Sequence, residues 1–450
     1  MATAAPYVII GNSTAAIGCI EGIRTLDKEN PIIVISDEQY AAYSRPLISY
    51  LLEKRTDERH MMLRGRHFYK ENNVTFMPGR TAAAIDAANK IVRLADGEEV
   101  AYGKLLNATG SRPFVPPMAG LDDMPQYFTF LSLDSAKAVE KAITRKSRVL
   151  IIGAGLVGMK CAEGIAERVG SVTVVEMAPR VLPAALLEDG SALIQKQMEA
   201  HNCTFLLGDS IARFTPNYPK GTAPDGEKPP LGGTAHSNNG ADIEFDVLIC
   251  AVGVRPNTQL VEGAGGAVDK GIVIDENCRT TLPDVWAAGD CTLSYDLTAD
   301  ASRILAMLPN AYFQGECAGI NMAGGEKPFT KAMPLNSAGF FGLHMATAGS
   351  YTGDCIDASR PAVKAKGFLP AQSAQYRKFF VKDDLLKGFI IIGDISRSGI
   401  YTSMIREQIP VSSVDFDAIK EEPRLIAFSK SRREAILSAK EEPAEATVSF

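Results

Sequence analysis

A repeated strand-turn-helix pattern is the feature of this sequence that most limits the folds open to it. Tyr7 to Ile10 is a short apolar, β-branched run that stops at Gly11, and the same pattern returns before Gly153. Each copy closes on a Gly-x-Arg-Pro turn, at Gly110 and at Gly253. The first and closing glycines are 99 positions apart in one copy and 100 in the other. An internal duplication of a whole nucleotide-binding domain is the simplest explanation.

The duplication predicts an α/β fold with two tandem Rossmann-like dinucleotide-binding domains, each of three ββα layers, plus a C-terminal α+β domain. We expect the first domain to be discontinuous, over residues 1–118 and 253–330. The second domain is expected over residues 119–252, inserted between the two parts of the first.

The rest of the chain has a different pattern. Alternating runs from Tyr376 to Val381 and from Leu385 to Ile392 predict an antiparallel hairpin within an α+β domain over residues 331–420. Charge-rich stretches predict a tail over 421–450, with a short helix and a disordered end. Pro, Gly and Asn dominate from Thr215 to Asp242, which predicts an exposed, mobile excursion.

Composition excludes several functions. The chain has 450 residues and a net charge of −6, so it lacks the positive field of a general nucleic-acid-binding protein. Its eight cysteines and five histidines show no cluster, zinc-knuckle or HExxH spacing, and no metal site is predicted. The longest apolar stretch is too short for a membrane span and no signal peptide is evident, so we expect a cytoplasmic protein.

The second glycine loop is a complete GxGxxG between a strand and a helix. The first glycine makes the tight turn, the second lets the backbone approach a pyrophosphate, and the third lets the helix pack on the strand. The helix N-terminus then faces the phosphates. A glycine-rich turn that binds nothing is the alternative. The predicted contact residues are Gly153, Gly155, Leu156, Val157 and Gly158.

An acidic residue follows the next strand. Glu176 comes directly after Val172 to Val175, where its carboxylate can accept hydrogen bonds from the adenosine ribose and repel a 2′-phosphate. The sequence therefore favours NADH over NADPH. Arg180 lies four residues further on and leaves NADPH open.

The first glycine loop is a degraded version of the second. Serine and alanine stand where glycine is expected, but both are small, and the Ser13 hydroxyl can donate to a phosphate. A dinucleotide can therefore still bind. The residues predicted to hold it are Gly11, Ser13, Thr14, Ala15 and Ala16.

Together these motifs resemble the pyridine nucleotide-dependent flavoprotein reductases related to glutathione reductase. The resemblance covers about residues 6–330 and includes the strand end Ala108-Thr109-Gly110 and the stretch from Thr281 to Asp290. It implies that the first domain binds FAD and the second binds NAD(P)H. It also implies that Asp290, in the Gly-Asp motif, holds a flavin ribityl hydroxyl. The alternative is an aspartate that caps the following helix.

The resemblance implies further cofactor contacts. Asp37 is expected to bind the FAD adenosine ribose, with Glu38 as its rival, and Ala82 to touch the adenine through its backbone. The other residues that it places at the cofactors are Arg45, Pro46, Ala108, Thr109, Gly110, Arg112, Gly253 and Gly289.

The stretch from Tyr43 to Ser49, Tyr-Ser-Arg-Pro-Leu-Ile-Ser, is similar to one in rubredoxin reductases, ferredoxin reductases and apoptosis-inducing-factor-like proteins. Disulfide reductases place a cysteine pair on this helix, and NADH oxidases and peroxidases place one cysteine there. This chain has no cysteine between 19 and 161. The thiol relay is therefore missing, and the resemblance implies that electrons leave directly from the flavin.

Two positions depart from these relatives. They carry a lysine near flavin N5 after Arg-Pro-x-x-Ser and a glutamate after the second GxGxxG, where this chain has Tyr50 and Lys160. Lys160 is disfavoured near a helix N-terminus. Our hypothesis is that it stabilises anionic reduced flavin or orients nicotinamide, with Tyr50 beside it. An ordinary surface lysine is the alternative.

The sequence thus predicts an NADH-dependent FAD flavoprotein that passes electrons to a separate redox protein or to an Fe–S or metal-containing subunit. A basic stretch from Lys54 to Lys70 is either a solvated face or a docking surface for an acidic electron-transfer partner. The stretch from Lys387 to Asp394 resembles rubredoxin reductases and flavin portions or subunits of NADH-dependent Fe–S enzymes. An oligomer through the C-terminal domain is left open. The alternatives are a stand-alone NADH oxidase or disulfide reductase, and a flavin-binding interaction protein.

Overall fold

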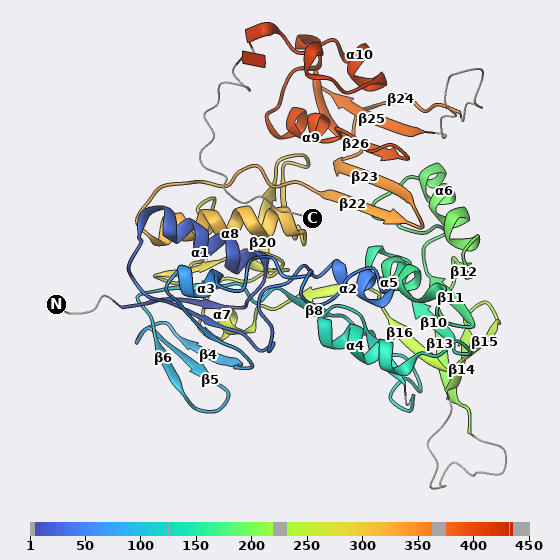
Figure 1. Cartoon of the computed structure of the whole chain (residues 1–450), viewed down its shortest axis with the longest axis horizontal. Helices are drawn as coiled ribbons and strands as arrows, with labels where there is room; N and C mark the ends of the chain where they lie inside the picture. The colour runs from blue at the N-terminus through green and yellow to red at the C-terminus, as the bar shows by residue number, and fades with distance from the viewer. Residues whose placement is uncertain (1–4, 125, 219–231, 362–374, 432, 435–450) are drawn as a thin grey trace. The chain divides into compact units, whose positions relative to one another are not determined.

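The computed structural model describes residues 5–124, 126–218, 232–361, 375–431 and 433–434. The chain divides into two compact units. The first comprises Met1–Asp296, Asp300–Ala332 and Phe340–Leu343, and the second comprises Leu297–Ala299, Met333–Gly339 and His344–Phe450. Both are mixed α/β in content (Figure 1).

The first unit contains two five-stranded parallel sheets. One has the order β3-β2-β1-β7-β19, and the other has the order β12-β11-β10-β16-β9. The strands of the first sheet are β1 (Tyr7–Ile10), β2 (Ile32–Ile35), β3 (Val74–Met77), β7 (Lys104–Asn107) and β19 (Val285–Ala287). Those of the second are β9 (Tyr127–Thr129), β10 (Arg148–Ile152), β11 (Ser171–Glu176), β12 (Cys203–Leu207) and β16 (Val247–Cys250).

The predicted strand-turn-helix repeats are confirmed as local structure. Strand β1 leads into α1 (Thr14–Leu26), and β10 leads into α5 (Leu156–Ala166). The β-branched residues of these strands are buried because both faces of a parallel sheet are covered. The Gly-x-Arg-Pro turns continue into β8 (Ser111–Pro113) and β17 (Val254–Pro256), which pair with each other in antiparallel fashion.

Each parallel sheet is accompanied by a three-stranded antiparallel sheet. One consists of β4 (Ala82–Asp86), β5 (Ile91–Leu94) and β6 (Glu99–Ala101), and the other of β13 (Ile211–Pro216), β14 (Gly233–Ser237) and β15 (Asp242–Phe245). The second of these corrects the prediction of an exposed excursion over 215–242. Gly233, Ala235 and Ser237 alternate on the buried face of β14, where small residues give little sequence signal. Residues 219–231 lie outside the described part of the chain.

Two helices of the first unit pack unusually closely. Helix α8 (Leu308–Met322) runs beside α1, and glycines stand at the crossing on both helices. A Cβ on Gly315 would lie 2.0 Å from the Ala15 carbonyl oxygen, and one on Gly319 would lie 2.2 Å from that of Cys19. Residue numbers increase in the same direction on both helices, from the Ala15–Gly315 contact to the Cys19–Gly319 contact. The helices are therefore parallel, with both N-termini at the same end.

The described part of the first unit contains eight further elements. They are α2 (Leu47–Leu52), α3 (Phe68–Glu71), α4 (Leu133–Ala142), α6 (Glu188–Glu199), α7 (Gln259–Gly263), β18 (Ile272–Val273), β20 (Thr292–Asp296) and β21 (Ala301–Arg303).

The second unit is built on a five-stranded sheet of order β22-β23-β26-β25-β24. The predicted hairpin is confirmed, since β25 and β26 pair in antiparallel register. Helix α9 packs its buried side on this sheet. The elements are β22 (Leu335–Phe340), β23 (Leu343–Gly349), β24 (Asp354–Asp357), β25 (Tyr376–Lys382), β26 (Leu385–Ile392), α9 (Gly399–Arg406), α10 (Phe416–Glu421) and 3-10 turns at Val411–Ser413 and Leu425–Ala427.

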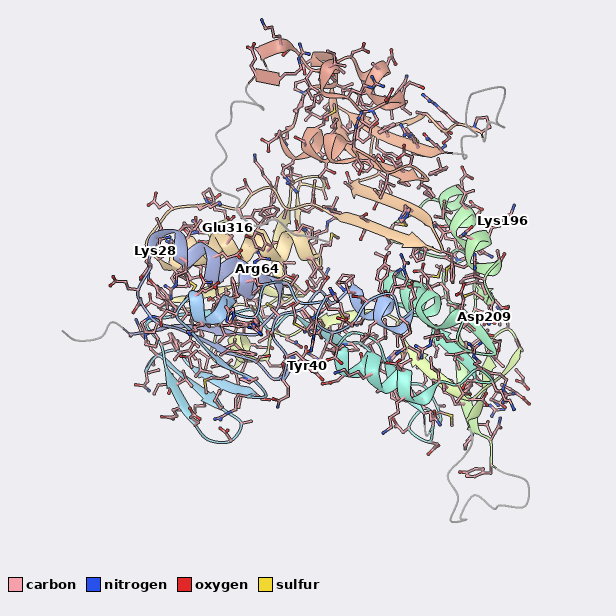
Figure 2. All side chains as sticks on the ribbon, viewed as in Figure 1. Lys28, Tyr40, Arg64, Lys196, Asp209 and Glu316 are labelled. Atoms are coloured by element: carbon pink, nitrogen blue, oxygen red, sulfur yellow. The ribbon has the colours of Figure 1, made fainter. Side chains whose placement is uncertain are left out.

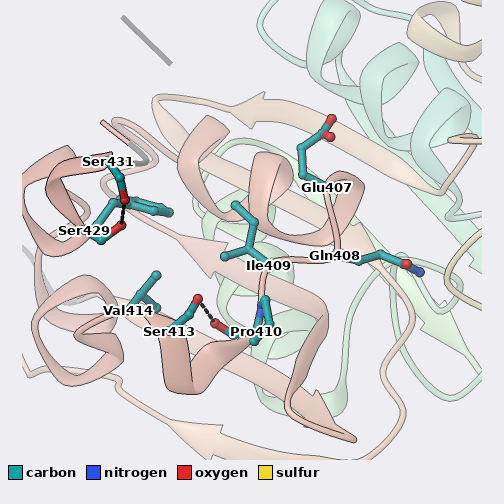
Figure 3. Close-up of a pocket in the computed structure, with 9 residues that line it drawn as sticks. Glu407, Gln408, Ile409, Pro410, Ser413, Val414, Ser429 and Ser431 are labelled. Carbon is teal, nitrogen blue, oxygen red and sulfur yellow. Dashed lines mark hydrogen bonds between the residues drawn. The ribbon is translucent and has the colours of Figure 1, made fainter. Parts of the chain in front are cut away.

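Part of the described tail packs against the core of this unit, while Leu425 and Ile426 are 41% and 71% exposed. Phe428 is 4% exposed and clusters with the buried face of the sheet. A cavity of about 400 Å³ is lined by Ile409, Val414 and Phe428 among others (Figure 3). Serine hydroxyls also line it, and the Ser413 hydroxyl donates to the Pro410 carbonyl at 2.6 Å. No predicted cofactor residue lies there.

Candidate functional site

A cavity of about 420 Å³ lies at the carboxyl ends of β1, β2 and β7. Ligands of open parallel sheets bind at this edge. The cavity collects residues from segments far apart in the sequence. Thirteen predicted cofactor residues line it: Gly11, Ser13, Thr14, Ala15, Asp37, Glu38, Arg45, Ala82, Ala108, Thr109, Gly110, Gly289 and Asp290.

The loop at the end of β1 depends on its glycine. Gly11 has φ +100°, and a Cβ there would lie 2.1 Å from the Ala108 carbonyl oxygen. The loop then opens α1, whose N-cap Ser13 makes no side-chain capping bond. Residues Leu308 and Ala311 at the start of α8 also line the cavity. The positive ends of two parallel helices therefore meet at one cavity, which favours an anionic ligand.

Two buried polar atoms lack a protein partner at this site. The Thr14 hydroxyl and the Arg80 Nε are buried and form no hydrogen bond, and both residues line the cavity. Buried donors without partners are costly unless a ligand supplies an acceptor. These donors and the two helix N-termini fit a dinucleotide with phosphates and ribose hydroxyls, as FAD has.

Asp290 supplies the opposite charge. Burial raises the pKa of its carboxyl, and the Ser111 hydroxyl donates to Oδ2 at 3.3 Å. Gly289 precedes it with φ +87° and donates its N–H to the Gln314 side chain at 2.8 Å. The glycine turn and its hydrogen bond hold the carboxyl at the cavity wall, where it can accept a hydrogen bond from a ligand hydroxyl.

The two candidate ribose carboxylates have different surroundings. Glu38 forms an ion pair with Arg45 and accepts a hydrogen bond from the Tyr43 hydroxyl at 2.7 Å. Asp37 is exposed and forms no side-chain hydrogen bond in the described structure. The geometry therefore favours Asp37 as the carboxylate that is available to a ligand.

Four predicted FAD-loop or closing residues do not line this cavity. Ala16 is fully buried in α1, and Pro46 and Gly253 lie outside the cavity wall. Arg112 stands opposite Arg255 in the β8–β17 ribbon and lines a neighbouring cavity of about 550 Å³. Its guanidinium donates to the Asn257 side chain at 3.1 Å. The Arg112 guanidinium thus contacts Asn257, which lines the cavity that collects the other predicted residues.

Several cavity residues were missed by sequence reasoning. Asn257 directly follows the second Gly-x-Arg-Pro, so its position in the repeat was a usable signal, whereas Arg80 and Leu131 gave none. The missed lining residues are Ile10, Asn12, Ile35, Ser36, Arg80, Thr81, Ala83, Ser111, Leu131, Asn257, Gln259, Leu260, Ala288, Leu308 and Ala311.

The second glycine loop has the geometry predicted for it. Gly153 has φ +102°, and a Cβ on Gly158 would lie 2.0 Å from the Gly153 carbonyl oxygen. A Cβ on Gly155, the middle glycine, would meet nothing within 4 Å. The first and third glycines are thus required for packing, and the middle one leaves open space where a pyrophosphate can approach. Val157, in the same loop, is 38% exposed.

The acidic residue at the end of β11 is held by backbone N–H groups of the neighbouring loops. Glu176 accepts hydrogen bonds from the backbone N–H of Ala154 at 2.8 Å and of Ala178 at 2.9 Å. Arg180 donates to the carbonyls of Pro183 and Leu186, each at 3.3 Å. The carboxylate is therefore oriented at the loop, while the guanidinium is tied to the segment that follows it.

The structure brings Lys160 and Tyr50 together. The Lys160 Nζ lies 4.5 Å from the centre of the Tyr50 ring and forms an ion pair with Glu163. The Lys160 side chain is 16% exposed and that of Glu163 is 4% exposed. The other Glu163 oxygen accepts the Phe341 N–H at 2.6 Å. Such burial argues against an ordinary surface lysine. Neither Lys160 nor Tyr50 lines the cavity of about 420 Å³.

The basic stretch divides into two groups. Lys54, Arg55 and Arg64 form ion pairs with glutamates of the same unit. Arg59, Arg66 and Lys70 are exposed and form no ion pair in the described part of the chain. Figure 2 labels Arg64 beside α1, where its partner Glu21 lies. The second group carries positive charge without an ion-pair partner in the described structure, while Lys54 and Arg55 are paired but still 59% and 64% exposed.

Residues 5–315 match the family described as pyridine nucleotide-disulphide oxidoreductase, which covers more than half of the chain. The chain belongs to this family. It is therefore an oxidoreductase that uses FAD and NAD(H). Among the described residues, no helix combines the length and apolar character needed to cross a membrane.

Similar proteins include an enzyme subunit, an NADH oxidase and a reductase in complex with its partner. The epsilon subunit of NADH-dependent phenylglyoxylate dehydrogenase from Aromatoleum evansii is 32% identical over 406 residues, which cover 89% of this chain and 91% of that subunit. An NADH oxidase from Methanocaldococcus jannaschii is 31% identical over 341 residues, 74% of this chain and 72% of that enzyme. The covalent putidaredoxin reductase–putidaredoxin complex contains a chain with the same fold, at a TM-score of 0.79 and 22% identity, over 97% of this chain and 99% of that one.

Proposed function

We propose that this oxidoreductase takes electrons from NADH and passes them through FAD to a separate redox protein or metal-containing subunit. Residues 1–118 and 253–330 hold FAD, residues 119–252 hold NADH, and residues 331–420 with the described tail provide a contact surface for the acceptor. When bound, FAD supplies the conversion of a two-electron donor into one-electron steps.

The observation that carries this proposal is a flavin-type cavity without a thiol. None of the described residues that line it is a cysteine. The nearest in sequence, Cys291, is fully buried and donates to the Ala288 carbonyl at 3.4 Å. Burial raises the pKa of Cys291 to about 11, so it stays protonated and unreactive at neutral pH. A thiol relay of the disulfide-reductase kind therefore has no residue to run through.

The protein's own groups position the cofactors. The N-terminus of α1, with the Thr14 hydroxyl, would hold the FAD pyrophosphate, Asp37 its adenosine ribose, and Asp290 a ribityl hydroxyl. The loop from Gly153 to Gly158, with Glu176, would hold NADH. None of these residues exchanges a proton with a substrate, so the chain contributes orientation and electrostatics.

The test compares electron acceptors under anaerobic and aerobic conditions. With FAD-loaded protein and NADH, we expect benzyl viologen or a rubredoxin to be reduced at least tenfold faster than oxygen is consumed. Glu176→Ala should slow both reactions through a higher KM for NADH while leaving the FAD content unchanged. Faster peroxide formation from oxygen, or thiol formation from a disulfide, would contradict the proposal.

A stand-alone NADH oxidase is the second candidate, because one relative of 31% identity has that name. It predicts that oxygen is the faster acceptor and that no partner protein accelerates turnover. A flavin-binding interaction protein predicts slow turnover with every acceptor and a stable complex with its partner.

A further inference from the structure

A single phenol connects the FAD cavity with the start of α4. Tyr43 is 4% exposed. Its hydroxyl donates to Glu38 at 2.7 Å and accepts the backbone N–H of Leu133 at 2.8 Å. Leu133 is fully buried and is the first residue of α4. The Tyr43 hydroxyl thus satisfies an N–H that neither helix nor solvent can satisfy.

The cavity side of this phenol is a charged pair. Glu38 and Arg45 both line the FAD cavity and form an ion pair. The Arg45 Nη1 also donates to the Leu131 carbonyl at 3.3 Å, and Leu131 lines the same cavity. A ligand that orders Glu38 and Arg45 therefore also fixes Glu38 as the acceptor of the Tyr43 hydroxyl and Arg45 beside it.

The other side leads into the second parallel sheet. Residues 130–132 join β9 to α4, and β9 is the edge strand paired with β16 of that sheet. Helix α4 also contacts α2, which follows Arg45 and Pro46 in the chain. The segment that Tyr43 holds is thus continuous with the sheet that carries the second glycine loop.

We propose that the Tyr43 hydroxyl couples occupancy of the FAD cavity to the position of β9 and α4, and so to the placement of the NADH-binding sheet. Tyr43 is a positioning residue, because it acts through Glu38 and the Leu133 amide. This inference rests on the proposed function, since it needs FAD in the cavity.

The experiment measures amide hydrogen exchange with and without FAD in the wild type and in Tyr43→Phe. In the wild type, FAD should slow exchange at least tenfold both at residues 11–20 and at residues 127–142. In Tyr43→Phe, FAD should still protect residues 11–20, and protection of residues 127–142 should fall below threefold. The variant's maximal rate with NADH should fall at equal FAD content.

Tyr40→Phe is the matched control. Tyr40 donates its hydroxyl to Asp134 in the first turn of the same helix but does not line the FAD cavity (Figure 2). The Tyr40→Phe variant should show the wild-type protection of residues 127–142 by FAD. The coupling would be overturned if FAD protected residues 127–142 equally in Tyr43→Phe and in the wild type. It would also be overturned if the wild type bound FAD but showed no protection of residues 127–142. Absence of FAD protection at residues 11–20 in wild type would instead overturn the cavity assignment and the coupling with it.

Should Tyr43→Phe lose its fold, Glu38→Gln repeats the experiment, because glutamine keeps an acceptor for the phenol but removes the charge that pairs with Arg45. It should weaken the protection of residues 127–142 relative to residues 11–20. Unchanged relative protection in this variant would also overturn the coupling.

Discussion

At the residue scale, Asp290 shows a side chain placed for a ligand at a cost to the free protein. Its carboxyl is half-buried and accepts one long hydrogen bond from Ser111, and burial raises its pKa. Because the native pKa lies above that of the unfolded chain, the native state binds more protons, so stability falls as pH rises above the ordinary value of 3.8.

Asp290→Asn should therefore stabilise the FAD-free protein by about 1 kcal/mol at pH 7 and weaken FAD binding at least tenfold. The stability difference should vanish below pH 3.8 and grow as pH rises. Thermal unfolding of the FAD-free protein across this range, with FAD titration by fluorescence, measures both effects. Stability that is unchanged at pH 7 would show that the carboxyl carries no burial cost.

Lys160 is held by a buried countercharge. Lys160→Met would leave the Glu163 carboxylate without its cation and should destabilise the protein by about 3 kcal/mol. The double variant Lys160→Met/Glu163→Gln should recover most of that loss. If Lys160 stabilises reduced flavin, both variants should lower the flavin midpoint potential by about 30 mV, a difference of about 1.4 kcal/mol. Wild-type potentials in both would make Lys160 purely structural.

The contacts of individual side chains were harder to predict from the sequence than the turns that carry them. The sequence pointed to thirteen of the residues that line the cavity of about 420 Å³, because glycines with positive φ and small residues follow a strand end for steric reasons that are local. It did not identify Arg80, Leu131 or the Tyr43 bond to Leu133, because these depend on which loops meet in space. Arg112 was placed at the cofactor by resemblance, and its actual neighbours are Asn257 and Arg255.

At the element scale, the crossing of α1 and α8 sets the geometry of the FAD cavity. Glycines at positions 18, 22, 315 and 319 allow the helix backbones to touch, which brings both N-termini to one point. The close approach was not evident from the sequence, since Gly-xxx-Gly in a soluble helix also occurs without a partner.

Gly315→Ala should force these helices apart, because its Cβ would meet the Ala15 carbonyl oxygen at 2.0 Å and backbone cannot yield cheaply. We expect a loss of about 2–3 kcal/mol in unfolding free energy and a purified protein depleted of FAD. Gly65→Ala is the control, since its Cβ would meet nothing within 4 Å and should leave stability within about 0.5 kcal/mol. Full FAD content in Gly315→Ala would show that the crossing does not govern the cavity.

Four strands of the two parallel sheets could be predicted from the sequence, but the edge strands β9 and β19 could not. The β-branched runs at β1, β2, β10 and β11 announce buried strands, whereas the fifth strands β9 and β19 come from short segments with no such run. The hairpin around residues 215–242 was misjudged because its inward positions are Gly, Ala and Ser.

At the scale of the whole molecule, a negative net charge coexists with a local group of exposed cations. The chain carries −6 overall, yet Arg59, Arg66 and Lys70 are exposed without ion pairs in the described structure. An acidic acceptor should therefore associate faster at low salt.

Arg66→Glu should raise the KM for an acidic rubredoxin or ferredoxin about threefold to tenfold at low ionic strength, with the KM for NADH unchanged. The difference should shrink at 0.5 M salt. Arg55→Glu, at a residue already paired with Glu53, serves as comparison and should have the smaller effect on the acceptor. Equal effects of the two reversals would argue against a docking role for the exposed group.

The β8–β17 ribbon has a consequence for how such a chain could arise. Pro113 pairs with Val254, so the polypeptide leaves for the segment between them and returns at adjacent points. A gene encoding one ancestral nucleotide-binding unit could therefore accept a second copy of itself within a surface loop without disturbing either ladder of hydrogen bonds. The same adjacency means that a tight turn could join Pro113 to Val254 if the segment between them were removed.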